Sequence, residues 1–148
     1  MASESLLTYV PLVRALATPA PARRLVLASS TQTPTQRLLD KWGGYCQALF
    51  RELLEESPRD LARLVANRGL RVSRLTYAAE ILGDAKDSRL VKKALLPLLK
   101  HESPIVREGA ILGLARHLDE EVRGALEDVA ANDQSETIRR SASETLTD

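Results

Sequence analysis

Cysteine and histidine are scarce in this sequence of 148 residues, which limits the chemistry that it can perform. Cys46 is the only cysteine and excludes a disulfide bond within the chain. His101 and His117 are too far apart in the sequence to form a metal-ligand motif with one cysteine, so no metal site is expected. We expect both histidines to face solvent at helix ends. Cys46 falls on an apolar stripe, where a buried, inert thiol is expected rather than a nucleophile.

Aromatic residues and strand patterns are also rare. A core with so few aromatic rings must be built from Leu, Val, Ile and Ala, and this composition with abundant Arg and Glu favours helix over sheet. No segment alternates strictly between apolar and polar residues, so no strand is expected. An all-α fold follows. The five aromatic residues are Tyr9, Trp42, Tyr45, Phe50 and Tyr77.

Motifs of common enzyme classes are missing as well. The sequence has no Gly-x-Ser-x-Gly nucleophile elbow, no phosphate-binding Gly-Lys-Ser/Thr and no dinucleotide-binding glycine pattern. Carboxylates such as Glu120 and Glu121 are plentiful, but nothing marks two of them as a pair with separated acidities. We therefore predict no catalytic residue, no cofactor and no enzyme activity.

Long apolar runs are absent, which bears on location. No segment approaches 18 uninterrupted apolar residues, so no membrane span is expected. The first residues lack a basic region followed by an apolar run and a cleavage site, so no secretory signal is expected. The resulting expectation is a cytoplasmic protein.

Charge is balanced overall but unevenly distributed. The net charge is +1, while residues 1–77 carry eleven basic and six acidic residues and residues 78–148 carry ten and fourteen. The two halves therefore differ by nine charges, from +5 to −4. Such asymmetry can steer association with a charged partner.

Residues 1–69 predict a helical N-terminal region. A short helix over about 4–17 is followed by a linker over about 18–35 that is rich in proline and polar residues. Pro34 then opens a helix over about 34–56, and Ser57 caps a further helix that ends near Gly69. This region has no convincing internal period, although its last two helices could form a degenerate pair.

Residues 70–148 contain a period of 32. Ala78, Ala110 and Ala142 are spaced by this interval, and so are Leu82 and Leu114. The pattern predicts helix pairs at about 71–83/88–100 and 104–117/120–131, and a last, unpaired helix at about 136–146. A two-helix repeat of this length is typical of an α-solenoid, because one pair cannot bury its apolar face without a neighbour. We expect the polar last helix to cap the stack.

The segment "LLPLLKHESPIVREGAILGLA" resembles HEAT repeats, with Leu-Pro-Leu-Leu on one helix and Val-Arg opening the next. "ILGDAKDSRLVKKAL" is similar to the variant named after phycobilisome lyases, in which Leu-Gly-Asp joins two helices. The resemblance implies a short right-handed α-solenoid of HEAT-like helix pairs over residues 70–148. The first unit departs from it, having Arg74-Leu75 in place of Val-Arg.

The resemblance also implies a binding surface, because the second helices of HEAT pairs line the concave face that commonly holds a partner. Leu96 and Leu99 are apolar residues left over once the expected core positions 90, 94, 95 and 98 are filled. The candidate partner-binding residues are Lys92, Lys93, Leu96, Leu99, Arg123, Glu127 and Asp128.

An arginine-rich stretch over residues 59–74 is the second candidate surface. It could meet an acidic protein or phosphate groups, but it lacks interleaved aromatics for stacking bases. This surface consists of Arg59, Arg63, Arg68, Arg71 and Arg74, with Trp42 as a further interface anchor if it is exposed.

Three functions remain open at this level. A non-catalytic module that binds another protein, as an adaptor, regulator or assembly factor, fits best. A nucleic-acid-binding helical repeat using residues 59–74 is the alternative, and the near-neutral charge argues against it. The hypothesis of a lyase-like or accessory enzyme subunit rests only on the resemblance to the phycobilisome-lyase type of repeat. Self-association through the N-terminal region or the last helix also stays open.

Overall fold

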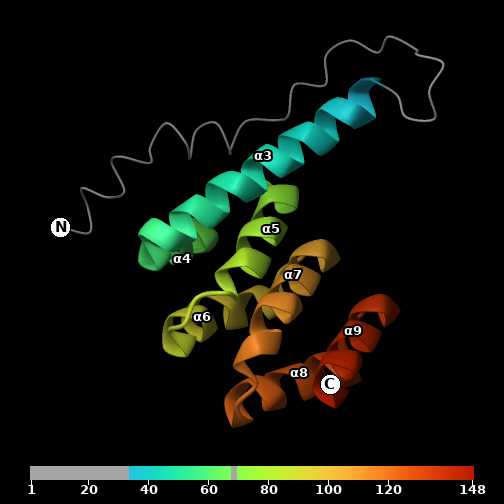
Figure 1. Ribbon diagram of the computed structural model, residues 1–148. Helices are drawn as coiled ribbons and strands as arrows, with labels where there is room; N and C mark the ends of the chain where they lie inside the picture. Colours follow the sequence, from blue (N-terminus) through green and yellow to red (C-terminus); the bar gives the residue numbers. More distant parts are fainter. Residues whose placement is uncertain (1–33, 68–69) are drawn as a thin grey trace.

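The computed structural model describes residues 34–67 and 70–148, and side chains from residue 44 onward. The expected helix over 4–17 and the linker over 18–35 fall largely outside the described residues. All elements in the described part of the chain are helices, as predicted (Figure 1). They are α3 (Pro34–Glu56), α4 (Pro58–Ala66), α5 (Val72–Leu82), α6 (Ser88–Leu95) with the 3-10 turn η1 (Leu96–Lys100), α7 (Pro104–Leu114) with the 3-10 turn η2 (Ala115–His117), α8 (Glu120–Asn132) and α9 (Glu136–Thr147).

Side-chain caps fix where several of these helices begin. Ser57 accepts a hydrogen bond from the backbone N–H of Asp60, as its position before Pro58 predicts. Asp87 and Asp119, which are one full period apart, cap α6 and α8 in the same way. The period therefore repeats the start signals as well as the apolar residues.

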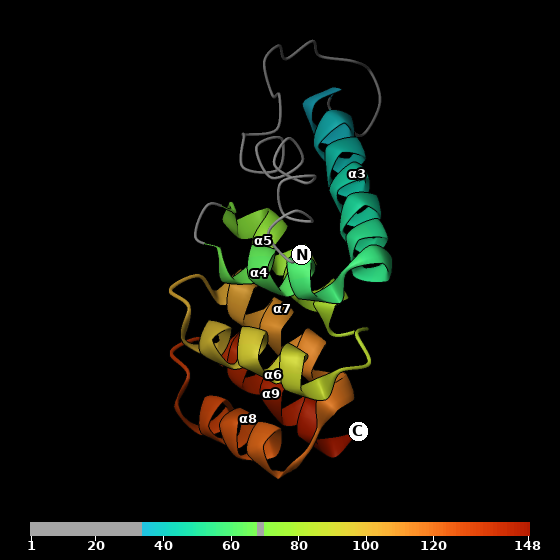
Figure 2. The ribbon, with the colours of Figure 1, turned by 90° about the vertical axis from the view of Figure 1, so that its left-hand side faces the viewer.

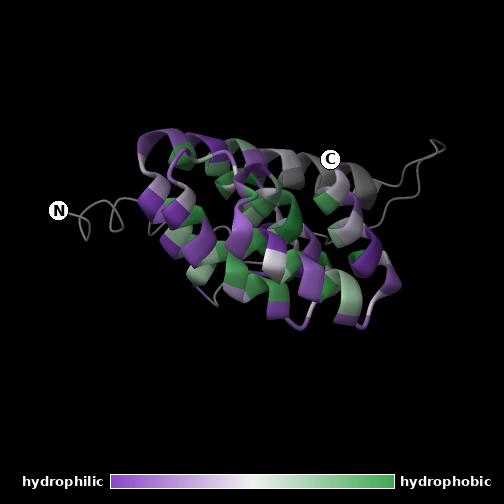
Figure 3. Ribbon diagram, turned by 90° about the horizontal axis from the view of Figure 1, so that it is seen from below, coloured by the Kyte–Doolittle hydropathy of each residue, from purple (hydrophilic) through white to green (hydrophobic). Residues whose placement is uncertain are grey.

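The helices form two layers. The first helices of successive pairs, α5, α7 and α9, pack side by side, and α3 packs against α5 (Figure 1). The second helices form the other layer, in which α4 lies against α6 and η1 lies against α8 (Figure 2). Hydrophobic residues gather between the layers, and hydrophilic residues cover much of the outside (Figure 3). This is the stacked arrangement of an α-solenoid.

The same period continues into α3, although no period was expected in residues 1–69. Cys46 precedes Ala78 by one full period, and Phe50 precedes Leu82 by the same interval. All four side chains are buried in the common core. A cysteine and a phenylalanine in place of alanine and leucine hide the repeat from inspection by residue type. Whether residues 1–69 fold as a separate unit stays a prediction.

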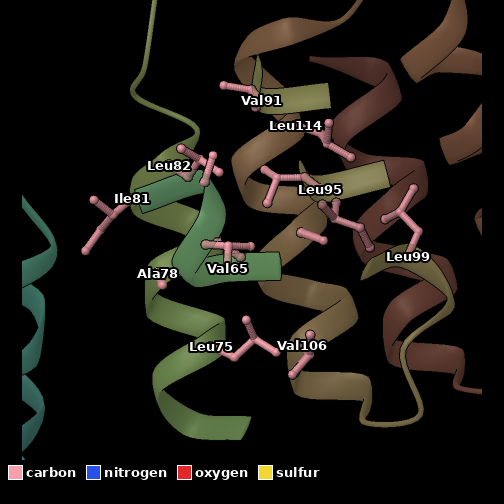
Figure 4. Packing of buried hydrophobic residues seen from close by; sticks show 14 of the residues in the cluster. Val65, Leu75, Ala78, Ile81, Leu82, Val91, Leu95, Leu99, Val106 and Leu114 are labelled. Atoms are coloured by element: carbon pink, nitrogen blue, oxygen red, sulfur yellow. The ribbon is translucent and has the colours of Figure 1, made fainter. Parts of the chain in front are cut away.

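The core register of α6 differs from the expected one. The sequence pattern predicts positions 90, 94 and 98 in the core beside Leu95, but the side chains at those three positions are only partly buried. Val91, Leu95 and Leu99 are the buried residues (Figure 4). Two apolar stripes lie one residue apart in this helix, and the space beside Gly113 accommodates Leu95. Val72, at the start of α5, is 38% exposed.

Glycines allow α5 and α7 to approach closely. A Cβ on Gly113 would lie 2.5 Å from the carbonyl oxygen of Ala79, and one on Gly109 would lie 2.7 Å from that of Thr76. Gly83, in the Leu-Gly-Asp turn, abuts the backbone of Gly113. Because the nearest atoms are mostly backbone, a side chain at these sites would push the two helices apart.

A buried ion pair joins the second repeat to the third. Arg107, on α7, donates from Nε and Nη2 to the two carboxylate oxygens of Asp133 at 2.8 and 2.9 Å. Its Nη1 donates to the carbonyl oxygens of His101 and Glu102. Arg139 donates to the backbone carbonyl of Asp133. Both arginines therefore bind the turns that precede the first helices of successive repeats.

The Arg107–Asp133 pair makes stability depend on pH. Burial of Asp133 disfavours its charge, but hydrogen bonds from Arg107 and from the Ser135 N–H outweigh this effect, so the pKa of the carboxyl lies below its ordinary value. The stabilisation is therefore complete above the ordinary pKa of about 3.9 and is lost as the pH falls through the lower, folded-state pKa.

We expect Asp133→Asn to have a lower free energy of unfolding than the wild type, by an amount that does not change with pH near neutrality. Below about pH 4 the difference from the wild type should narrow, because the wild-type carboxylate becomes protonated there. Urea unfolding between neutral pH and about pH 3 measures this difference. A gap that stays constant to the lowest pH would contradict the assigned role of the carboxylate.

Candidate interaction surface on the second helices

The side chains that α4, α6–η1 and α8 expose form what we call the second-helix face. These helices lie one below another in Figure 2. Two hollows open between them, one between α4 and α6 and one between η1 and α8. The first measures about 640 Å³ and the second about 440 Å³. Both are present in the chain alone, so a partner would find them already formed.

The α4–α6 groove has an apolar floor, and its charged lining residues are one cation, Lys93, and one carboxylate, Glu102. Its floor consists mainly of aliphatic side chains from both helices and from the start of α5, and Lys93 stands at its edge. The lining residues are Val65, Ala66, Asn67, Leu70, Leu75, Lys93, Ala94, Pro97, Leu98, His101 and Glu102. The groove can therefore take apolar side chains while Lys93 meets a negative charge.

The η1–α8 groove contains several of the residues predicted from sequence. Leu96, Leu99 and Asp128 line it together with Ala125, Val129 and the ends of Lys100 and Glu121. Leu96 is half-buried at its floor. The prediction that Leu99 is available to a partner is wrong, because its side chain is only 7% exposed and belongs to the core. The one-residue shift in the α6 register explains the error.

Lys92 and Lys93 are adjacent in the sequence but have different environments. The Lys92 ammonium lies 2.5 Å from Asp119 and 2.8 Å from Glu121, so it bridges α6 to the start of α8. Hydrogen bonds to these two carboxylates raise the pKa of Lys92. Lys93 is exposed beside the α4–α6 groove. Lys92 therefore joins two repeats, whereas Lys93 is exposed and forms no ion pair in the described part of the chain.

Arg123 and Glu127 lie apart from the other candidates, in a shallow hollow of about 570 Å³ at the start of α8. They follow Val91 and Leu95, which are fully buried on α6, by one full period. The same positions on α8 are exposed and charged. Charged residues here do not suit a further HEAT helix, so this edge of α8 fits the end of the stack.

The arginine-rich stretch does not form one surface. Arg59 and Arg63 are exposed on α4, and Arg63 lies 3.6 Å from the buried Asp60. Arg71 is exposed in a different hollow, beside Val72 and Ile105. The prediction that Arg74 belongs to a binding surface is wrong, because Arg74 is buried and only 3% exposed. Arg68 and the side chain of Trp42 lie outside the described residues.

The repeat itself could have revealed the position of Arg74. It precedes Val106 by one full period, and Ile138 follows Val106 at the same interval. All three positions are buried. Counting arginines by proximity in sequence placed Arg74 on the surface, whereas aligning the repeats places it in the core.

Cys46 is a free cysteine buried in the core. Burial raises the pKa of the Cys46 thiol, and a hydrogen bond with Arg74 only partly offsets this effect. A thiol with a raised pKa is a poor nucleophile at neutral pH, as the position of Cys46 on the apolar stripe predicts.

The two histidines also make structural contacts. His117, expected in solvent, is half-buried and hydrogen-bonded through its two ring nitrogens to Ser88 Oγ and the Gly83 carbonyl. His101 Nδ1 accepts a hydrogen bond from the Ser103 N–H. Both imidazoles therefore hold turns of the solenoid in place.

In the described part of the chain, no group of three or more His, Cys, Asp or Glu side chains is arranged to hold a metal ion. None of the helices in this part of the chain combines the length and the apolar character that crossing a membrane requires.

The stacked helix pairs and the face formed by their second helices define an α-solenoid. Residues 75–147 match the family model for HEAT repeats, in agreement with the two-helix period seen in this part of the chain. The phycobilisome-lyase variant is not part of that match. No curated protein and no solved structure matches the chain significantly.

Proposed function

We propose that this chain binds another protein along the second-helix face, as an adaptor, regulator or assembly factor. The observation that carries the proposal is the pair of grooves between neighbouring second helices, which have apolar floors and charged, exposed rims. HEAT repeats commonly serve as protein-interaction modules. A rigid stack supports such a site, because little ordering is needed when the partner binds.

Nucleic-acid binding is less well supported. The arginines of residues 59–74 are divided among α4, a separate hollow and the core, so they do not form a continuous basic stripe. The exposed charges of α8 are mainly acidic, which would repel a phosphate backbone passing over the whole second-helix face.

Ala125→Arg tests the proposed face. Ala125 is half-buried and lines the η1–α8 groove, so an arginine there should fill the groove while its charged end reaches solvent. Ala131→Arg is the matched control on the same helix, because Ala131 is exposed and outside that groove. Tagged forms of the wild type and both variants would be used to isolate bound proteins from the source cells, after melting curves confirm that each is folded.

We expect the wild type and Ala131→Arg to retain the same specific partner, and Ala125→Arg to lose most of it. Equal retention by all three proteins would contradict binding at the η1–α8 groove. Recovery of nucleic acid in place of protein, sensitive to nuclease, would favour the alternative function.

A further inference from the structure

The second-helix face is divided into a basic part and an acidic part. The segment from α6 through η1 carries four basic residues and no acidic residue. On α8 four acidic residues accompany one arginine. On α4 the arginines are exposed and the single acidic residue, Asp60, is buried. The basic part therefore covers α4 and α6–η1, on both sides of the α4–α6 groove.

The exposed basic residues occupy corresponding places on the two helices. Leu61 is buried on α4 at the place that Val91 occupies on α6, and the same alignment matches the buried Val65 with the buried Leu95. The same alignment pairs two exposed cations of α4 with two of α6. These pairs are Arg59 with Arg89 and Arg63 with Lys93. Neighbouring helices thus present two matching pairs of cations, of which Lys93 lines the groove itself.

Several of these cations are not neutralised by the chain itself. In the described part of the chain, Arg89, Lys93 and Lys100 form no ion pair, unlike Lys92. Uncompensated cations beside an apolar groove favour a ligand that carries both negative charges and apolar side chains.

We propose that the α4–α6 groove binds an acidic, amphipathic segment of a partner protein. Apolar side chains of the segment enter the groove over Val65, Leu75 and Leu98. Its carboxylates meet Lys93 at the edge of the groove and the exposed Arg89, one helical turn earlier on α6. The inference rests on the proposed function and specifies the partner chemistry for one part of the same face. The chain's own residues 1–33 have the wrong charge for this role, with three arginines and one acidic residue.

Synthetic peptides provide a direct test that needs no knowledge of the natural partner. The probe is a fluorescent helical peptide of about four turns with a leucine stripe and glutamates on its other face. One control peptide carries lysine in place of each glutamate, and another carries serine in place of each leucine. Anisotropy titrations would use the full chain, the double variant R89E/K93E and a matched double variant, K86E/R140E. Lys86 and Arg140 are exposed and lie outside the groove, and both double variants change the net charge equally.

We expect the acidic leucine peptide to bind the wild type and K86E/R140E with similar affinity. R89E/K93E should weaken that binding by roughly tenfold or more, since two close charge contacts become repulsive. The lysine and serine peptides should bind far more weakly. Raising the salt concentration should weaken the specific binding.

Three results would overturn the inference. The first is equal affinity for the acidic and lysine peptides. The second is binding that R89E/K93E leaves unchanged. The third is evidence for a different occupant. Tighter binding of a mixed-sequence DNA duplex with the same dependence on R89E/K93E would make the occupant nucleic acid, and self-association that R89E/K93E abolishes would make it a second copy of the chain. If the partner lost from Ala125→Arg is still retained by R89E/K93E, the proposed function stands and this inference fails.

Discussion

Gly113→Val should destabilise the protein by about 3 kcal/mol, at the upper end of the cost of overpacking a tight core position. The new Cβ would lie 2.5 Å from the Ala79 carbonyl oxygen and 2.6 Å from Leu95 Cδ1. The first of these atoms is backbone, so α5 and α7 must separate. For a chain of this size the expected decrease in Tm is roughly 6–12 °C, measurable by thermal unfolding.

Gly124→Ala is the matched control, because Gly124 lies within α8 and a Cβ there would have nothing within 4 Å. Alanine has the higher helix propensity, so this variant should be more stable by about 0.5–1 kcal/mol. Gly113→Ala should be destabilised despite the same gain in propensity. If both alanine variants gain stability, the close approach of α5 and α7 is wrong.

Arg107→Ala should cost about 3–5 kcal/mol, as is usual when one partner of a buried ion pair is removed. The side chains of Arg107 and Asp133 are 11% and 7% exposed, so solvent cannot replace the lost guanidinium. Two backbone carbonyls, those of His101 and Glu102, also lose their donor. Urea unfolding of the wild type and the variant measures the loss.

Arg116→Ala provides the comparison for Arg107→Ala. Arg116 pairs with Asp84 at the same 2.8 Å, but their side chains are 58% and 32% exposed. Solvent screening should limit its effect to about 1 kcal/mol or less. Similar losses from the two variants would show that burial does not distinguish the two ion pairs.

Helix positions could be predicted because the signals that define them are local and repeated. Pro34, Pro58 and Pro104 open helices, and Asp87 and Asp119 cap them, so the start of each of these elements is marked in the sequence. The regular spacing of the repeat then indicated which faces meet. The family match over residues 75–147 and the all-helical structure of the described residues confirm this part.

Side-chain environments were harder to predict, because they depend on neighbours from other repeats. Leu99 is buried because it continues the buried stripe of Val91 and Leu95, and Leu95 packs beside Gly113 of another helix. Arg74 is buried since it occupies the position of Val106 in the next repeat. Both errors came from judging a residue by its type or its sequence neighbours alone.

The candidate site was predicted as a face but not as grooves. Leu96, Asp128 and Lys93 do line hollows between second helices, while Lys92 bridges two repeats. Arg123 lies at the far edge of α8. Sequence periodicity indicates which side of a helix is exposed, but the gaps between helices depend on three-dimensional packing.

Hydrogen–deuterium exchange tests the central claim most directly. It would be measured on the full chain alone and in complex with the partner protein that the wild type retains from the source cells. The second-helix face should become protected, so peptides from α6, η1 and α8 should exchange more slowly in the complex. The first-helix surface around Leu112 on α7, which is 42% exposed, should be unchanged. Protection around Leu112 with no change in α6, η1 and α8 would contradict the assignment of the second-helix face as the binding surface.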